Sequence, residues 1–208
     1  MSEELQRTEA WHADRCGKFT GSRFVDVLAR NKRTGEKLKA WHSLCWQVAC
    51  ERLTGVQDEG PDGFALRWGR EVEPFAREAY EFETGHIVEE VGFITHPAYP
   101  MAGCSPDGLI GTEGGIEMKS PKSSLVHLER LISGIPDEYV PQVQGCMWVT
   151  GRSWWQFVSY DPRMPEQHRL FIQRIERDDA FIAELATAVI EAEQRVIEIL
   201  EQLSKRAA

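Results

Sequence analysis

The chain has 208 residues, of which 42% are hydrophobic and 27% charged, and its formal net charge is −9. This length and composition indicate a globular protein with a real hydrophobic core and exclude a disordered chain. We expect one domain over residues 1–208, in which residues 180–208 form a C-terminal amphipathic helix.

Nothing in the sequence predicts membrane insertion or secretion. No stretch approaches the ~20 consecutive apolar residues of a membrane span, and the first residues lack a signal-peptide apolar region. The five cysteines form no Cys-x-x-Cys pair, so neither a zinc site nor a disulfide framework is indicated. We therefore expect a cytoplasmic protein with reduced thiols and no membrane partner.

The negative charge is concentrated near the C-terminus. Residues 176–201 contain eight acidic and two basic residues, whereas residues 30–39 contain five basic residues and one acidic residue. An acidic total argues against a nucleic-acid partner, but the local potential decides DNA contact. Residues 30–39 are either a solvated loop or a loop that follows a phosphate backbone, since such contacts need only positioned cations.

A candidate phosphate site precedes the first expected helix, whose apolar residues begin at Phe24. Thr20 or Ser22 is expected to cap this helix, and Arg15 lies shortly before. A hydroxyl at a helix N-terminus beside an arginine can bind phosphate. The simpler alternative is an ordinary cap with a surface arginine.

Two longer helices are expected before the first sheet residues. The second runs from Pro74 to Thr84, with positions 72, 75, 76, 79 and 80 facing inward and Glu73 at the edge of that stripe. The first is interpreted as core, including both of its tryptophans. The residues that we assign to the core in this first helix are Leu38, Trp41, Leu44, Cys45, Trp46, Val48, Ala49 and Leu53.

A strand is expected over residues 87–94, and a hairpin follows it. The apolar runs 109–110 and 116–118 are separated by Gly111 to Gly115, where Gly114 and Gly115 can supply positive φ. The hairpin carries Asp107 to the same end of the sheet as Glu117 and Lys119. Because side chains alternate along a strand, Glu117 and Lys119 project from one face.

Two carboxylates and an amine on one face are suited to metal-dependent phosphodiester hydrolysis. Carboxylates hold Mg²⁺, which keeps several waters and accepts phosphate oxygens as ligands. Two such ions ~4 Å apart stabilise the attacking and leaving oxygens, and the ammonium can orient or activate the attacking water. By itself, however, the Asp and Glu-x-Lys pattern is also met by many surface hairpins with solvated charges.

Downstream of the hairpin we expect helices over 127–132 and 139–149, strands over 154–161 and 170–175, and the C-terminal helix. Gln142 and Gln144 are two residues apart, so only one of them can face a site. Trp154 and Trp155 must likewise face opposite sides of their strand. The apolar stripe of the last helix either packs on its own body or contributes to a subunit contact. The pattern as a whole predicts an α/β fold with a mixed central β-sheet flanked by α-helices.

Several motifs together resemble the phage lambda exonuclease family, also called alkaline exonucleases or YqaJ-like viral recombinases, within the PD-(D/E)XK nucleases. The resemblance covers roughly residues 6–179 and is carried by Ser-Pro-Asp-Gly at 105–108, Glu-Met-Lys-Ser-Pro at 117–121 and Asp-Pro-Arg-Met at 161–164. It implies the restriction-endonuclease-like core of that family.

The resemblance also implies roles for individual residues. Asp107, Glu117 and the backbone carbonyl of Met118 are expected to bind metal, Glu73 to add a further acidic group, and Lys119 to act on the attacking water. Gln142 is expected to order the site. The substrate-binding residues implied are Arg15 and Ser22 for the 5′-phosphate, Arg33 for the DNA backbone, with Lys32 as its alternative, and Leu66 as a wedge.

The expected activity is that of a Mg²⁺-dependent exonuclease, with two ions per site and Mn²⁺ as a substitute. It would degrade one strand of linear double-stranded DNA from a 5′-phosphate end and leave a 3′ overhang for recombination. The resemblance further implies a homotrimer ring and a single-strand annealing protein as partner. The alternatives are a sequence-reading PD-(D/E)XK endonuclease and a non-catalytic DNA-binding module.

Overall fold

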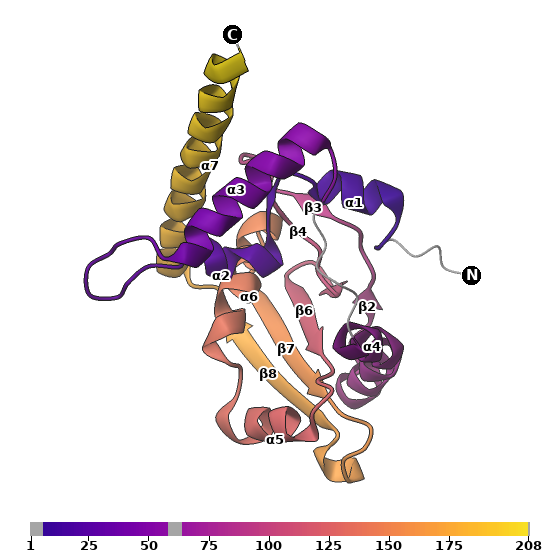
Figure 1. Ribbon diagram of the computed structural model, residues 1–208. Coiled ribbons are helices and arrows are strands. Elements are labelled where there is room, and N and C mark those ends of the chain that lie inside the picture. Colours follow the sequence, from indigo (N-terminus) through magenta and orange to yellow (C-terminus); the bar gives the residue numbers. More distant parts are fainter. Residues whose placement is uncertain (1–5, 58–63, 208) are drawn as a thin grey trace.

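The computed structural model describes residues 6–57 and 64–207, apart from the side chains of residues 64–66 and 207. It is an α/β protein in which two β-sheets are flanked by helices, as Figure 1 shows, and the predicted fold class is confirmed. The larger sheet has the order β2-β5-β6-β7-β8. Its strands are β2 (Val88–Glu89), β5 (Gly108–Ile110), β6 (Gly114–Lys119), β7 (Trp154–Tyr160) and β8 (Leu170–Glu176).

The larger sheet is mixed, and its register positions the candidate site. Strand β6 pairs antiparallel with β5 and parallel with β7. Gly108 lies opposite Ile116, so the same ladder continued by one residue sets Asp107 opposite Glu117. Directly opposed residues of an antiparallel pair share a face of the sheet. The hairpin therefore brings the two carboxylates together, as predicted.

The glycines of the hairpin act differently from the prediction. Gly111 has a φ of 52° and provides the left-handed turn residue, whereas Gly114 and Gly115 belong to β6 and do not have positive φ. Their role is close packing. A Cβ on Gly114 would lie 2.1 Å from the Trp154 ring, and one on Gly115 2.2 Å from the Trp155 ring. The absence of a side chain lets the two indoles of β7 lie over β6.

A smaller sheet has the order β1-β4-β3, with β1 (Phe19–Thr20), β3 (Ile94–Thr95) and β4 (Ala102–Cys104). The prediction of one strand over residues 87–94 was wrong, because β2 pairs in the larger sheet and β3 in the smaller one. Residues 90–93 between them include Gly92, and glycine weakens a strand interior.

Helix α3 (Lys39–Thr54) forms as expected but buries one face only. Trp41, Leu44, Cys45, Val48 and Ala49 lie in the core. The core assignment was wrong for Trp46, Leu53 and Leu38, which are 57%, 58% and 45% exposed. Trp46 is five residues from Trp41 and so points to another side of the helix, while the other two lie at or beyond its ends.

Helix α4 (Phe64–Thr84) begins ten residues before the expected start and continues through Pro74. Trp68, Val72, Ala76 and Tyr80, four residues apart, pack in one cluster with β5, β6 and β7 side chains. This packing compensates for the ~3 kcal/mol that an interior proline costs a helix. Phe75, which we expected to face inward, is 58% exposed because it lies off this line.

The N-terminal region consists of α1 (Glu9–Arg15), the 3₁₀ turn η1 (Gly21–Arg23) and α2 (Phe24–Val27). The predicted side-chain cap is absent, since no side chain caps η1 or α2. The hydroxyl of Thr20 is buried without a hydrogen-bond partner among residues 6–57 and 64–207, and Ser22 lies within η1.

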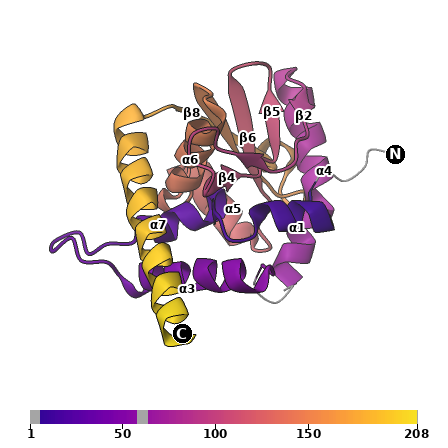
Figure 2. The ribbon, with the colours of Figure 1, turned by 90° about the horizontal axis from the view of Figure 1, so that it is seen from above.

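The remaining elements are α5 (Ser124–Ser133), η2 (Asp137–Tyr139), α6 (Val140–Thr150), η3 (Glu166–His168) and α7 (Asp179–Ala207). The larger core lies among α2, α3, α6 and α7 and the sheet residue Trp155, while Trp154 packs on the α4 side. Figure 2 shows α4 and α7 at opposite sides of the molecule. No helix in residues 6–57 and 64–207 is long and apolar enough to cross a membrane.

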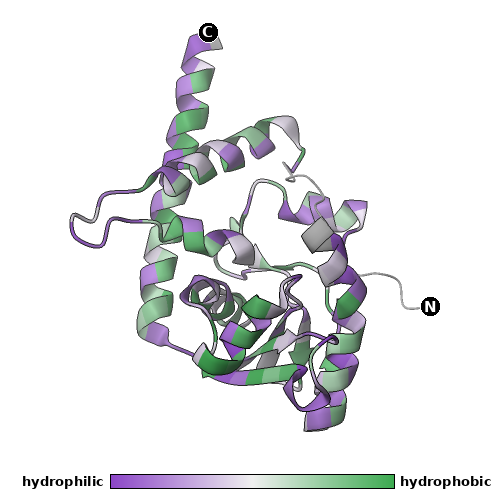
Figure 3. Cartoon of the chain, turned by 60° about the horizontal axis from the view of Figure 1, so that its bottom comes forward, coloured by the Kyte–Doolittle hydropathy of each residue, from purple (hydrophilic) through white to green (hydrophobic). Residues whose placement is uncertain are grey.

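Helix α7 packs on its own body over most of its length. Leu185, Val189, Ala192 and Val196 are buried against the other core helices. Its C-terminal end projects beyond the body in Figure 1, and Figure 3 shows hydrophilic and hydrophobic residues alternating along it. Leu203, in this end, is 49% exposed.

The contact between Gly115 and Trp155 predicts an effect on stability. Gly115→Ala forces the indole or β6 to shift, and overpacking of this kind should lower the free energy of unfolding by about 1–3 kcal/mol. As a control, Gly69→Ala meets no atom within 4 Å and should raise it by about 0.5–1 kcal/mol, because alanine favours a helix over glycine. Urea denaturation measures both. Equal stability of Gly115→Ala and the natural chain would contradict the close-packing role.

Candidate active site

Glu117 is the centre of a polar cluster on β6. Its side chain is 1% exposed, and its Oε1 accepts hydrogen bonds from Lys119 Nζ and from Gln142 Nε2, the latter at 2.7 Å. Its Oε2 is buried and has no hydrogen-bond partner among the described residues. Glu117 and Lys119 thus project together, as the alternation of the strand predicted, and one carboxylate oxygen remains available for a ligand.

Asp107 joins this cluster from the start of β5. Its Oδ2 accepts a hydrogen bond of 2.6 Å from the backbone N–H of Met118. Burial, followed by the negative charges of Glu117 and Glu73, raises the pKa of Asp107 well above its ordinary value, while Lys119 and the Met118 N–H act in the opposite direction. Burial and the neighbouring carboxylates thus both disfavour the ionised form of Asp107.

Lys119 is held as an ammonium ion by the carboxylates beside it. Burial alone would lower its pKa, but the carboxylates of Glu117 and Asp107 outweigh burial, and the pKa is raised above the ordinary value. Its side chain is 29% exposed, so the ammonium also reaches the solvent side of the cluster. A cation that neutralised the two carboxylates would remove the cause of this upward shift.

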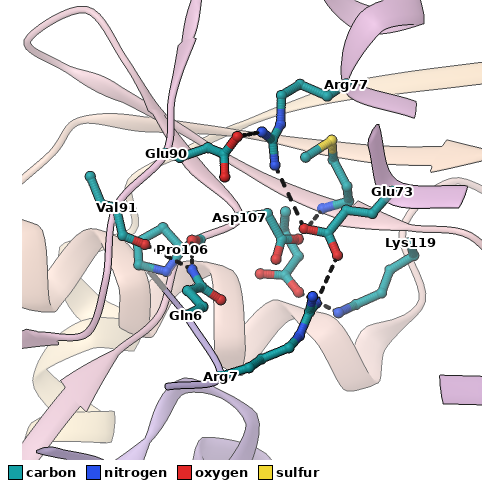
Figure 4. Close-up of polar contacts among 11 residues, drawn as sticks. Gln6, Arg7, Glu73, Arg77, Glu90, Val91, Pro106, Asp107 and Lys119 are labelled. Carbon is teal, nitrogen blue, oxygen red and sulfur yellow. Dashed lines mark hydrogen bonds and ion pairs between the residues drawn. The ribbon is translucent and has the colours of Figure 1, made fainter. Parts of the chain in front are cut away.

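Glu73 reaches the cluster from α4, as Figure 4 shows, where Glu73, Asp107 and Lys119 point toward a common region. Its Oε2 lies 3.0 Å from Arg7 Nη2 and its Oε1 3.7 Å from Arg77 Nη2. Arg77 also pairs with Glu90. The Glu73 carboxylate is therefore bound by two arginines.

A cavity of about 720 Å³ opens over the cluster. Asp107, Lys119, Glu73 and Gln142 line it. Its cationic lining residues outnumber its three acidic ones. These cations are Arg7, Arg70, Lys119, Lys122 and Arg130. The local charge thus favours an anionic ligand although the whole chain carries −9.

The residues present fit a divalent cation. The buried Glu117 Oε2 has no hydrogen-bond partner in the part of the chain that the structure describes, and the Asp107 carboxylate beside it offers further oxygen ligands of the kind that Mg²⁺ and Mn²⁺ bind. Within the described residues, no three His, Cys, Asp or Glu side chains are already arranged around one point as a metal cage. The third carboxylate, Glu73, is engaged by Arg7 and Arg77 instead.

Of the two glutamines on α6, Gln142 faces the cluster. Gln144 is buried on another side of the helix, where its Nε2 donates to the Glu176 carbonyl at 2.9 Å and its Oε1 accepts from Asp178 N–H. The two side chains thus diverge, as their spacing requires.

The expected substrate-binding residues do not all meet at the cavity. Ser22 lines it, whereas Arg15 does not. Arg15 Nη1 donates to Ser105 Oγ at 2.9 Å, and its guanidinium lies 4.1 Å from the Trp11 ring centroid. Ser105 is two residues before Asp107, so Arg15 is connected to the loop that carries the first carboxylate.

The other two expected DNA contacts lie elsewhere. Arg33 and Lys32 are exposed in the loop between α2 and α3, which projects away from α4 in Figure 1. Arg30 and Lys37 at the base of this loop pair with Glu191 of α7, which reduces its basic potential. The side chain of Leu66, at the start of α4, lies outside the described residues.

Sequence reasoning missed two groups in the cavity wall. Arg130 is 5% exposed, and its Nη2 donates to Tyr139 Oη at 3.2 Å. Arg7 comes from a segment with no recognisable motif. Neither residue stands in a motif that gave a signal, since Arg7 precedes α1 and Arg130 lies within α5.

A family model for the YqaJ-like viral recombinase domain matches residues 10–153. The chain belongs to this family. The matched range contains every residue of the acid and amine cluster described above, which agrees with the expected family resemblance.

Solved structures and a sequence relative extend this assignment. An alkaline exonuclease from Laribacter hongkongensis, LHK-Exo, is 43% identical, with a TM-score of 0.88 over 96% of this chain and 98% of that one, and it has also been solved in complex with dAMP. A phage-related exonuclease from Haemophilus somnus 129PT shares the fold at 16% identity and a TM-score of 0.73, over 89% of this chain and 96% of that one. The protein ExoD of Escherichia coli (strain K12) is 35% identical over 69 residues, 33% of this chain and 78% of its own length.

The raised pKa of Asp107 predicts how the stability of the metal-free protein depends on pH. A carboxyl whose folded pKa exceeds its ordinary 3.8 stabilises the fold below that value and loses this contribution as the pH rises through the folded pKa. Asp107→Asn does not titrate and can still accept from Met118 N–H. With a chelator present, its stability relative to the natural chain should therefore increase as the pH rises above 3.8. A difference that stays constant in denaturation curves across this range would contradict the raised pKa.

Proposed function

We propose that this protein is a divalent-metal-dependent exonuclease that degrades one strand of linear double-stranded DNA from its 5′ end. The products would be 5′-mononucleotides and a duplex with a 3′ overhang, which homologous recombination uses. Family membership and the 43% identity to an alkaline exonuclease support a DNA exonuclease. The observation that carries the proposal is the buried Glu117, with one oxygen bound by Lys119 and Gln142 and the other without a partner, beside Asp107.

The carboxylates of Asp107 and Glu117, with the Met118 carbonyl, are the proposed ligands of divalent cations, and Glu73 is proposed to complete the site. Two Mg²⁺ ions, with Mn²⁺ as a substitute, would supply charge stabilisation for phosphodiester hydrolysis when bound. The protein's contribution is a fixed set of oxygen donors on β5 and β6, which hold their positions because strand pairing sets them.

Lys119 and Gln142 are proposed to act on the attacking water and the scissile phosphate. The Lys119 ammonium, whose pKa is raised in the metal-free cluster, can donate to the water or to a phosphate oxygen. Removal of a proton from that water by Lys119 requires a lower pKa, which follows if bound cations neutralise Glu117 and Asp107. Gln142 fixes the Glu117 carboxylate through its 2.7 Å hydrogen bond.

The 5′-phosphate end is proposed to bind near Ser22, which lines the cavity, and Arg15, which is held by Ser105. A phosphate that replaced Ser105 as a partner of Arg15 would lie close to the Asp107 loop. Arg33, or Lys32, is proposed to contact the DNA backbone outside the cavity, and Leu66 to pack against the DNA near the separating strands.

A homotrimer ring and an annealing protein that receives the overhang are further proposals. Exposed apolar side chains support a subunit contact, since Phe82 of α4 and Ile87 beyond its end are 91% and 82% exposed. Exposed apolar surface marks an interaction site where it forms a contiguous patch. Sedimentation analysis of the purified protein tests the trimer.

Cleavage should depend on a DNA end. With Mg²⁺, linear duplex carrying a 5′-phosphate should be degraded, the same duplex with a 5′-hydroxyl more slowly, and a covalently closed circle not at all. A chelator should stop the reaction. Nicking or cutting of the circle would instead favour an endonuclease, and absence of any Mg²⁺-dependent cleavage would favour a non-catalytic DNA-binding module.

Lys119→Ala should lose cleavage but retain DNA binding. Loss of a positioned proton-transfer group typically lowers the rate by about 10²–10⁴-fold, whereas the other cavity cations still attract DNA. Lys205→Ala, near the exposed end of α7, is the control and should cleave normally. Single-turnover cleavage and electrophoretic mobility shifts measure the two properties. Normal turnover by Lys119→Ala would remove this residue from the mechanism.

A further inference from the structure

The segment before α1 is attached to the loop that carries Asp107. The amide Nε2 of Gln6 donates to two backbone carbonyls, that of Val91 at 2.9 Å and that of Pro106 at 2.7 Å. Pro106 directly precedes Asp107. Figure 4 shows Gln6 between these two carbonyls and the next residue, Arg7, directed toward Glu73. Gln6 is therefore held against the loop that carries Asp107, and Arg7 beside it lines the cavity.

Arg7 has an unusual backbone conformation at this position. Its φ is +67°, and among the described residues it is the one non-glycine residue with positive φ. Such a conformation is costly for a residue with a side chain, and it is concentrated at functional sites. The ion pair between Arg7 and Glu73 is 39% and 25% exposed at its two side chains, so it stabilises the fold little. The small stabilisation from the Arg7–Glu73 ion pair therefore does not account for the strained backbone of Arg7.

Glu73 has a second arginine, and this makes Arg7 available for another partner. Arg77, four residues along α4, lies 3.7 Å from the same carboxylate. Cations bound by the carboxylate cluster would compete with Arg7 for Glu73. A guanidinium released in this way stays at the cavity wall through Gln6, where its fork of N–H groups matches two phosphate oxygens.

We propose that Arg7 is a substrate-binding residue, an inference that rests on the proposed nuclease function. In the metal-free protein it neutralises Glu73, and in the metal-loaded protein it binds a phosphate of the DNA strand in the cavity. This exchange of partners couples metal binding to DNA binding, because the Arg7 guanidinium pairs with Glu73 in one state and with a DNA phosphate in the other.

Arg7→Gln tests the binding of DNA by Arg7. The control is Arg174→Gln, which removes another exposed ion pair, between Arg174 and Glu176 of β8. Binding of linear duplex DNA is measured over a range of salt concentrations with Ca²⁺ in place of Mg²⁺, and a gel verifies that the DNA stays intact. Arg7→Gln should weaken binding about tenfold and reduce the slope of log K against log salt by about one. Arg7→Lys should recover part of the affinity, and Arg174→Gln should behave as the natural chain.

Titration with Mn²⁺ in the absence of DNA is the second measurement. Because Arg7 competes with the cation for Glu73, Arg7→Gln should bind Mn²⁺ as tightly as the natural chain or several-fold more tightly. Gln6→Ala leaves the Arg7 guanidinium but removes the hydrogen bonds from Gln6 to the Val91 and Pro106 carbonyls. This variant should therefore also bind DNA more weakly than the natural chain.

Two results would overturn the inference. One is an Arg7→Gln protein with unchanged DNA affinity and salt slope, which would make Arg7 only a counter-ion of Glu73. The other is a loss of Mn²⁺ binding, which would make Arg7 a support of the carboxylate cluster. If the natural chain itself neither cleaves nor binds duplex DNA, the nuclease proposal fails as a whole, an outcome that these comparisons between variants distinguish from failure at Arg7.

Discussion

The site depends on a buried carboxylate that its own neighbours satisfy only in part. Glu117 is almost completely buried, and Lys119 and Gln142 bind one of its oxygens, while the other has no hydrogen-bond partner within the described part of the chain. Burial of an incompletely compensated charge is expensive. Asp107, opposite Glu117 in the ladder, adds to the same negative charge, so the fold tolerates a locally unfavourable arrangement that a bound cation would relieve.

Strand pairing and close packing hold this arrangement in place. Strand β6 is central in the larger sheet, between β5 and β7, so Glu117 and Lys119 cannot move without disturbing two ladders. Because Gly115 has no side chain, the indole of Trp155 packs directly against β6 in the same strand that carries Glu117. Helices α4 and α6 then add Glu73 and Gln142 from outside the sheet. The sheet thus fixes the positions of Asp107 and Glu117, and the helices supply Glu73 and Gln142.

The sequence predicted the part of the site that is local. Alternation along a strand and a short hairpin were enough to bring Glu117 and Lys119 to Asp107, and helical spacing separated Gln142 from Gln144. Pro74 misled the prediction of α4, because packing of the helix on the sheet overrides a proline that would end an isolated helix. Arg7 could not be predicted, since it reaches Glu73 across 66 residues of chain and its unusual φ has no sequence signal.

Calorimetric titration with Mn²⁺ shows whether the buried carboxylates hold divalent cations. The natural chain should bind Mn²⁺ saturably, and Glu117→Gln, which keeps the shape of the side chain but removes the charge, should bind it far more weakly. Equal Mn²⁺ affinity of the two proteins, or no binding by a folded natural chain, would mean that these carboxylates are not a cation site.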